Sequence, residues 1–72
     1  MAEESKKHIE LNTFLRIMVK TIPTGGQAKL IIRNGSVKVN GEVETRNKRK
    51  LYSGDFVEYL GKKYTILEEN LR

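Results

Sequence analysis

The most chemically suggestive stretch of this sequence is a cluster of basic side chains between residues 46 and 50. Four of its five positions carry positive charge, namely Arg46, Lys48, Arg49 and Lys50. The ordinary lysine content of a protein surface does not reach this density. Clustered positive charge is typical of proteins that bind a phosphate-rich partner. The stretch has no hydrophobic periodicity, so we expect it to form a loop or an irregular edge.

The distribution of charge along the chain supports the same interpretation. The formal net charge is +5, and residues 16–50 hold nine basic side chains against only Glu42 and Glu44. The two flanking parts of the chain each carry a slight negative excess. Charge alone leaves two possibilities open, a nucleic-acid surface or an ordinary solvated face. The further candidates for a phosphate contact are Lys20, Lys29 and Arg33.

Thr24 and Gly25 mark the expected start of a helix, where unpaired backbone amides attract anions. One hypothesis is that this helix start holds one backbone phosphate of RNA. The alternative is that Gly25 and Gly26 allow close packing of helices, and the sequence does not decide between the two. A nucleotide-binding loop is disfavoured, because no Gly-Lys-Ser/Thr follows and no strand precedes.

Catalytic and metal chemistry have little support in the sequence. There is no cysteine, and His8 alone can form neither a metal site nor a catalytic triad. A domain of 72 residues has little room for a deep pocket. No apolar stretch approaches the roughly 20 residues that span a membrane. We therefore expect a non-catalytic cytoplasmic protein with no cofactor, no metal, no small-molecule substrate and no membrane partner.

Two amphipathic helices are expected before the basic cluster. Leu11, Phe14, Leu15 and Met18 define the apolar face of the first helix, with Asn12 as its N-cap. Ile22 extends this face, and Pro23 is expected to end the helix, because it forces the preceding residue out of helical geometry.

The second helix begins with Thr24 and Gln27, which fit a capping box. Ala28 and Ile32 lie on its apolar face, and Gly35 stands where a left-handed helix end is expected. Lys29 falls off the apolar face, as Arg33 does, so both should be exposed.

Two hairpins are predicted from the remaining sequence. At Asn40-Gly41 a three-residue loop pairs Val37 with Val43 and Lys38 with Glu42, which matches like with like. We therefore expect a bulged turn and a partly neutralised Lys38.

In the second hairpin, a two-residue loop at Gly61-Lys62 pairs Tyr59 with Tyr64 and Val57 with Ile66. Tyr52 is expected to anchor the basic loop to the core, although it could instead stack on a base.

The run Ala28-Lys-Leu-Ile-Ile-Arg-Asn-Gly-Ser-Val-Lys-Val-Asn-Gly resembles the signature of the RNA-binding domain named after ribosomal small-subunit protein S-four. Gly54-Asp55 supplies the later Gly-Asp of that signature. The Thr-Gly-Gly-Gln-Ala-Lys variant most resembles the small stand-alone members of YaaA/YbcJ type. The chain departs from the pattern at Glu10-Leu11-Asn12, where the family often has Arg-Leu-Asp, and at Thr24-Gly25, where it often has Ser-Arg. Two of the usual RNA-contacting arginines of the family are therefore missing.

The resemblance implies an α+β fold of S-four (αL) type, with a two-helix hairpin packed on a small, mostly antiparallel sheet. Residues 1–8 are expected to be a disordered lead-in, and residues 9–72 one RNA-binding domain. Its partner would be structured RNA, such as ribosomal RNA, transfer RNA or a ribonucleoprotein. The expected RNA-binding residues are Lys20, Thr24, Gly25, Lys29, Arg33, Arg46, Lys48, Arg49 and Lys50. The alternative function is a protein-interaction module that docks on a larger complex.

Overall fold

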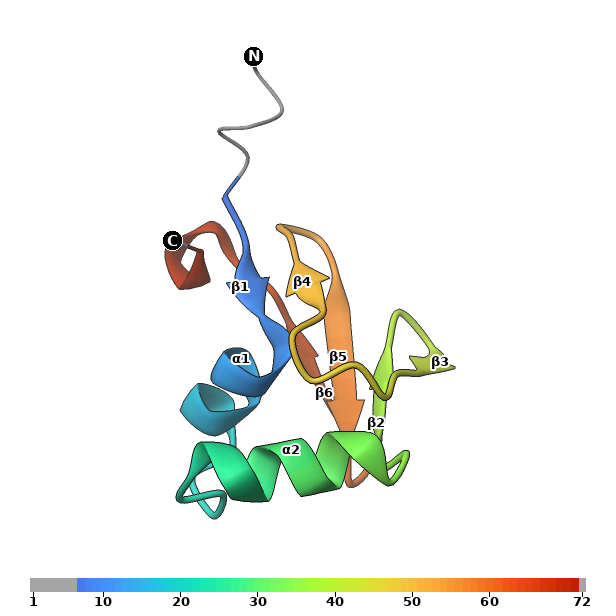
Figure 1. Ribbon diagram of the computed structural model, residues 1–72. Coiled ribbons are helices and arrows are strands. Elements are labelled where there is room, and N and C mark those ends of the chain that lie inside the picture. Colours follow the sequence, from blue (N-terminus) through green and yellow to red (C-terminus); the bar gives the residue numbers. More distant parts are fainter. Residues whose placement is uncertain (1–6, 72) are drawn as a thin grey trace.

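The computed structural model describes residues 7–71 and has the predicted α+β architecture (Figure 1). In chain order the elements are β1 (Ile9–Glu10), α1 (Leu11–Met18), α2 (Gly25–Arg33), β2 (Val37–Val39), β3 (Glu42–Val43), β4 (Lys50–Leu51), β5 (Phe56–Tyr59), β6 (Lys62–Thr65) and the 3-10 helix η2 (Glu68–Asn70). The strands form two antiparallel sheets, one of β1 and β4 and one in the order β3-β2-β5-β6. Within residues 7–71, no helix is both long and apolar enough to cross a lipid bilayer.

The helices form for the reasons that their sequences indicate. In α2, the Thr24 hydroxyl oxygen accepts a hydrogen bond from the Gln27 backbone amide at 3.2 Å, as a helix cap requires. Ala28 and Ile32 are buried, and Gly35 follows the helix with a φ of +87°. The left-handed helix end therefore lies where the glycine predicted it. The first helix is shorter than predicted, because α1 ends at Met18 rather than at Pro23, and Met18 is exposed rather than buried in the core.

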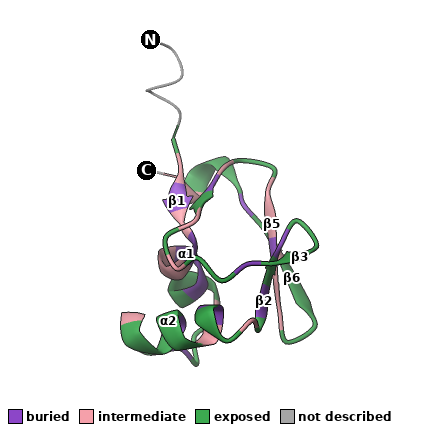
Figure 2. Ribbon diagram, turned by 45° about the vertical axis from the view of Figure 1, so that its right-hand side comes forward, coloured by how far each residue is buried: buried purple, intermediate pink, exposed green. Residues whose placement is uncertain are grey.

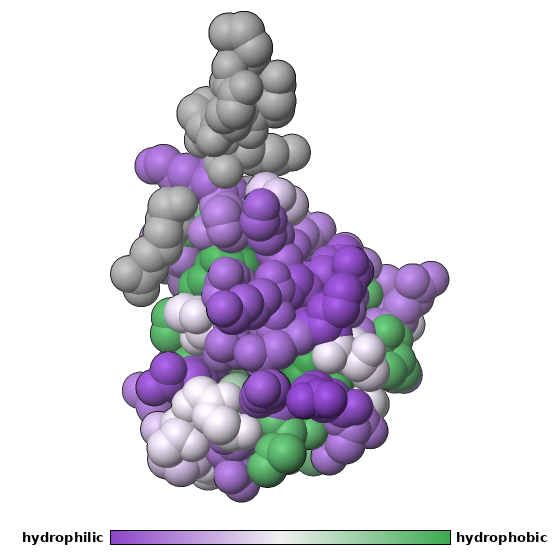
Figure 3. All heavy atoms as spheres, in the orientation of Figure 1, coloured by the Kyte–Doolittle hydropathy of each residue, from purple (hydrophilic) through white to green (hydrophobic). Residues whose placement is uncertain are grey.

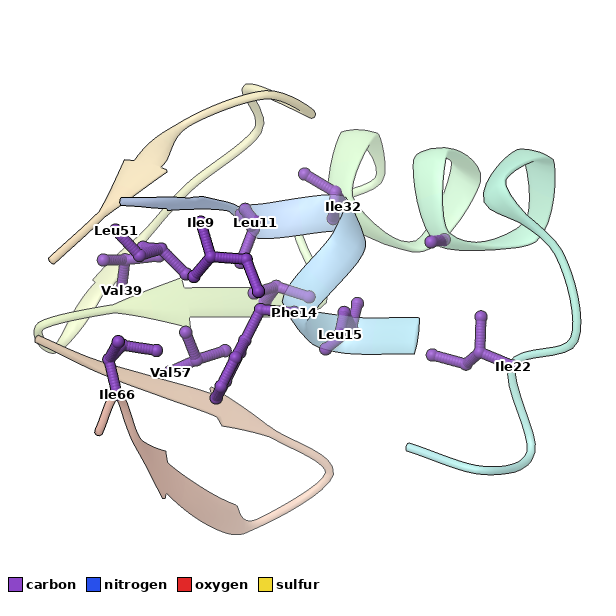
Figure 4. Close-up of a cluster of buried hydrophobic side chains, with 12 residues drawn as sticks. Ile9, Leu11, Phe14, Leu15, Ile22, Ile32, Val39, Leu51, Val57 and Ile66 are labelled. Atoms are coloured by element: carbon purple, nitrogen blue, oxygen red, sulfur yellow. The ribbon is translucent and has the colours of Figure 1, made fainter. Parts of the chain in front are cut away.

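The hydrophobic core lies between the helices and the four-stranded sheet. Figure 4 shows Ile32 of α2 on one side of the buried cluster and Val57 of β5 with Ile66 on the other. Phe14 and Leu15 of α1 lie between them and are fully buried. Figure 2 shows the corresponding pattern, in which buried segments face inward while much of α2 is exposed.

The β2–β3 hairpin differs from the prediction by one residue. Lys38 pairs with Val43 and Val39 with Glu42 around a two-residue loop of Asn40 and Gly41. Both loop residues have positive φ, 54° and 88°, which is the backbone of the tight hairpin turn that Asn-Gly favours. The predicted bulge and the Lys38–Glu42 pair were wrong, because β3 is a short edge strand. Val43 is exposed there, so no buried face selects the matched register.

The β5–β6 hairpin also differs from its prediction, because its loop begins one residue earlier and its strand pairing is therefore shifted by two residues. Its loop is Leu60-Gly61, so that Tyr59 pairs with Lys62 and Val57 with Tyr64. Leu60 has a φ of 52°, a conformation that leucine rarely adopts. The prediction placed Gly61 first in the loop because type II′ turns favour glycine there, and it was wrong.

Residues from the basic cluster, rather than a cap side chain, complete the start of α1. Glu10 occupies the N-cap position without a side-chain cap, and Asn12 lies inside the helix. The Leu11 amide donates to the carbonyl of Arg49 at 2.8 Å, and the Asn12 amide to that of Asn47 at 3.0 Å. These long-range hydrogen bonds satisfy backbone amides that would otherwise donate to a local cap side chain. The predicted lead-in falls largely on residues 1–6, outside the described residues.

Candidate nucleic-acid interface

The predicted cations between residues 46 and 50 lie on a segment that connects β3 to β4. We call residues 44–50 the cationic segment. In Figure 1 it crosses in front of β5, and Figure 3 shows hydrophilic atoms gathered over this face of the molecule. Its backbone is anchored to α1 through the carbonyls of Asn47 and Arg49. Its end, Lys50-Leu51, pairs with β1. The segment therefore has little regular secondary structure, but its backbone is held in place by hydrogen bonds to α1 and by pairing with β1.

A buried carboxylate organises the arginines of the cationic segment. Glu44 is only 7% exposed. Its Oε2 atom accepts from Nε of Arg46 at 2.8 Å and from the Arg46 backbone amide at 3.0 Å. Its Oε1 atom accepts from Nη2 of Arg46 at 3.1 Å and from Nη1 of Arg49 at 2.7 Å. One carboxylate thus orients two guanidinium groups.

The arginine contacts shift the acid–base behaviour of this carboxylate. The hydrogen bonds from Arg46, opposed by burial and reinforced by Arg49, lower the pKa of Glu44 from 4.5 to about 2. The same contact raises the pKa of Arg46. Glu44 is therefore charged throughout the physiological range. Even so, the Arg46 side chain stays 72% exposed, so its remaining donors face solvent.

The cations border a shallow hollow of about 640 Å³. Its lining residues are Arg46, Lys48, Arg49, Lys50, Tyr52 and Asp55. Lys48 and Lys50 are exposed, whereas Arg49 is partly buried. These four cations outnumber the two carboxylates near them, Asp55 in the lining and Glu44 beneath the arginines, so the site favours a polyanion.

The carboxylate in the hollow has a structural role. Asp55 Oδ2 accepts from the Tyr52 amide at 2.8 Å, which closes the turn before β5. Asp55 Oδ1 accepts from Asn40 Nδ2 at 3.2 Å, and Asn40 Oδ1 accepts from the Phe56 amide at 3.0 Å. The Asn-Gly and Gly-Asp motifs, 15 residues apart at these two side chains, therefore meet in one contact. Tyr52 is partly buried, with its ring centroid 6.2 Å from that of His8.

Two further candidate cations lie on α2. Lys29 and Arg33 are both exposed on α2. In Figure 1 the cationic segment crosses in front of β5 above α2, and the β5–β6 turn reaches the end of α2, where Gly35 and Ser36 line a hollow with Leu60 and Gly61. At the start of α2, a Cβ atom on Gly25 would lie 3.8 Å from Nη1 of Arg16. A guanidinium group thus stands close to the helix start that Thr24 caps.

Lys20 is separate from the other candidates. It lies in the link after α1 and borders a groove with residues of the β5–β6 hairpin, among them Tyr59, Leu60 and Tyr64. The structure thus brings the four cations of the segment around one hollow and places Lys20 beside the hairpin, while Lys29 and Arg33 are exposed on α2.

The role of Glu44 was missed at the sequence level, where it was counted only as an opposing charge. A signal was present in the spacing. In an extended chain, residues two apart point to the same face, so Glu44 and Arg46 can meet side by side. Within residues 7–71, no three histidine, cysteine or acidic side chains gather as a metal site would require.

These features define a small α+β domain whose cationic surface is held in place by hydrogen bonds. A family model described as the S4 domain matches residues 3–67, which is most of the chain. The chain therefore belongs to the S4 domain family.

Two relatives and one solved structure extend this assignment. The chain is 41% identical over 54 residues to a protein of Escherichia coli named "Putative RNA-binding protein YbcJ", covering 75% of this chain and 76% of that protein. It is 43% identical over 53 residues to a Bacillus subtilis protein named "Probable ribosome maturation protein RlbA", covering 74% and 73%.

The solved structure is the 30S ribosomal protein S4e from Thermoplasma acidophilum. It aligns with a TM-score of 0.70 and 26% identity over 86% of this chain. The alignment spans about a third, 32%, of the S4e chain, so the likeness concerns one domain of that protein.

Proposed function

We propose that this protein is a non-catalytic RNA-binding module that recognises structured RNA through the cationic segment and α2. The observation that carries the proposal is the arrangement of four cations around one hollow, two of them oriented by the buried Glu44. Arginine groups held in place lose less conformational freedom when they bind a phosphate than free side chains would.

The family and the relatives' names agree with this proposal. One relative is named as an RNA-binding protein and the other as a ribosome maturation protein. We infer that the partner is a folded RNA, ribosomal RNA in the first place, which would place the protein in the cytoplasm. Lys29 and Arg33 offer positive charge and few groups that read base edges. Recognition by shape and phosphate therefore fits better than sequence readout of duplex DNA.

Salt dependence tests the proposal directly. If the surface neutralises about four to six phosphates, the slope of log affinity against log salt should be about −3 to −5. We would measure the affinity for a ribosomal RNA fragment by fluorescence anisotropy between low and physiological salt. A flat response, or no binding at low salt, would leave the protein-interaction module as the better function.

A further inference from the structure

The β5–β6 hairpin carries an exposed leucine that nothing in the fold explains. Leu60 is 78% exposed, which is more than any other large apolar residue among the described residues. It is also held at a φ of 52°, in the left-handed region that side chains other than Asn, Asp and Gly avoid. The position thus combines two unfavourable features, an apolar side chain in water and a strained backbone.

The other hairpin of the same chain shows what the fold alone would select. Asn40-Gly41 has φ values of 54° and 88°, and Leu60-Gly61 has 52° and 77°. The two turns therefore share one backbone geometry, for which asparagine is a preferred first residue. Asparagine occupies this place at one turn and leucine at the other. The turn geometry does not account for a leucine at this position. An exposed, strained apolar residue of this kind is typical of a binding site.

Leu60 borders a groove of about 310 Å³ beside the end of α1. Tyr59 and Tyr64 line this groove and are partly buried against the core. The exposed cations Lys20 and Lys62 also line it. None of the described residues that line the groove is acidic. We call this site the hairpin groove.

We propose that the hairpin groove binds an unstacked nucleotide of RNA, an inference that rests on the RNA-binding function proposed above. The base would lie against the tyrosine rings and Leu60, and its flanking phosphates would contact Lys20 and Lys62. Aromatic and apolar side chains interleaved with cations are the usual means of binding single-stranded RNA. Two positive charges and no negative one favour a nucleotide over an uncharged ligand.

The hairpin groove would add to what the cationic segment does. The segment offers charge to phosphates, which every RNA sequence has in common. A groove that accepts a base can distinguish an unpaired nucleotide from a paired one, because only an unpaired base can leave the helix. The protein would then select RNA that presents a single-stranded nucleotide near a duplex.

The test uses Leu60→Asn, which gives this turn the residue found at the other turn and should fold at least as well. The probes are a short oligouridine, which has bases, and inorganic polyphosphate, which has none. Leu60→Asn should weaken oligouridine binding by roughly 3- to 10-fold and leave polyphosphate binding unchanged. Leu67→Asn, the same change at a half-exposed leucine away from the groove, is the matched control and should bind both probes as the wild type does.

Three outcomes would overturn the inference. One is unchanged oligouridine affinity in Leu60→Asn, and another is an equal loss for both probes. The third is Leu60-dependent binding of an acidic, leucine-rich peptide with no such dependence for oligouridine, which would assign the groove to a protein partner. None of these would touch the RNA-binding function itself. That function fails separately, if the wild type does not bind structured RNA at low salt.

Discussion

The two hairpins of the four-stranded sheet have similar turn geometry but differ in how their first turn residue interacts with the rest of the fold. On one side, the β2–β3 hairpin and the cationic segment each have a polar side chain that is hydrogen-bonded within the fold. Asn40 bonds to Asp55 and to the Phe56 amide, and Glu44 bonds to two arginines. On the other side, the β5–β6 hairpin holds Leu60 out in water.

The difference shows that regular structure and order of side chains are separate properties. The cationic segment has little regular secondary structure, yet hydrogen bonds to α1 and to Glu44 fix its position. The β5–β6 hairpin is a regular pair of strands, yet the side chain of Leu60 in its turn is exposed to solvent. We therefore expect stability to fall when the hydrogen-bonded side chains of the first region, Asn40 and Glu44, are replaced, and to rise when Leu60 of the second is replaced by asparagine.

The largest effect should follow Asn40→Leu, which makes the first turn resemble the second. The variant loses both side-chain hydrogen bonds of Asn40 and places leucine at a positive φ. We expect the free energy of unfolding to fall by roughly 2–4 kcal/mol. Urea denaturation would measure this. A loss below about 0.5 kcal/mol would show that the two turns are equivalent after all.

Glu44→Gln should have the next largest effect, and its sign separates orientation from net charge. The substitution removes a negative charge, so simple attraction predicts tighter RNA binding. We expect weaker binding, because Arg46 and Arg49 lose the acceptor that orients them. Stability should also fall, by roughly 2 kcal/mol, less than for a fully buried pair because Arg46 is exposed.

Affinity for a ribosomal RNA fragment and urea denaturation of the same samples would measure both effects. Lys38→Gln, at an exposed site on β2, is a control for a change of one charge. Tighter binding by Glu44→Gln would mean that the cationic segment acts only through its total charge.

The pH dependence of stability should report the same carboxylate. The folded-state pKa of Glu44 is lowered from 4.5 to about 2, so its ion pairs stabilise the protein fully above pH 4.5. This contribution is lost as the pH falls from 4.5 toward 2. We expect a decrease of roughly 1–3 kcal/mol across that window, reduced by solvent screening at Arg46. Denaturation at a series of pH values would show it.

Glu44→Gln provides the reference for the acid titration. Without the carboxylate, the decrease between pH 4.5 and 2 should be smaller than in the wild type by the amount that Glu44 contributes. Parallel curves for the two proteins would assign the acid sensitivity to other groups.

Much of the fold could be predicted because it depends on local signals. Thr24 caps α2 and Gly35 ends it, as their spacing indicates. The hairpin turn at Asn40-Gly41 was placed correctly while its register was not. Register depends on which face is buried, and β3 is an edge strand without a buried face.

The remaining differences come from long-range contacts. The amides at the start of α1 bond to carbonyls of Arg49 and Asn47, nearly 40 positions along the chain, and no local pattern encodes this. The candidate cations were found from charge density, helical periodicity and the family resemblance. Glu44 decides which of these cations are oriented by an ion pair. Its burial follows from the packing of the segment.

Charge neutralisation tests whether α2 and the cationic segment act as one surface. Neutralising Lys48 and Lys50 to Gln, or Lys29 and Arg33 to Gln, should each weaken RNA binding to a similar extent. We expect about 1 kcal/mol per lost phosphate contact, or roughly tenfold or more for each pair. Folding should change by less than about 0.5 kcal/mol, since all four side chains are exposed.

Lys38 and Lys63 form the matched control pair. They flank Glu58 on neighbouring strands, and Lys63 lies 4.2 Å from the centroid of the Phe56 ring. Neutralising both removes the same charge from a different face, so RNA affinity should change little. If all three pairs lose affinity equally, attraction depends on net charge and no defined surface exists.

The smallest effect should be a gain in stability from Leu60→Asn. Asparagine occupies left-handed backbone at lower cost than leucine, and the substitution removes an apolar side chain from water without opening a cavity. Since Leu60 is 78% exposed, little packing is lost. We expect the free energy of unfolding to rise by roughly 0.5–1 kcal/mol, which urea denaturation can resolve. Gly61→Ala is the opposing control, because it adds strain at a φ of 77° in the same turn and should destabilise. A loss of stability in Leu60→Asn would mean that the leucine supports the fold through its neighbours Tyr59 and Met18, and that its exposure has a structural cause.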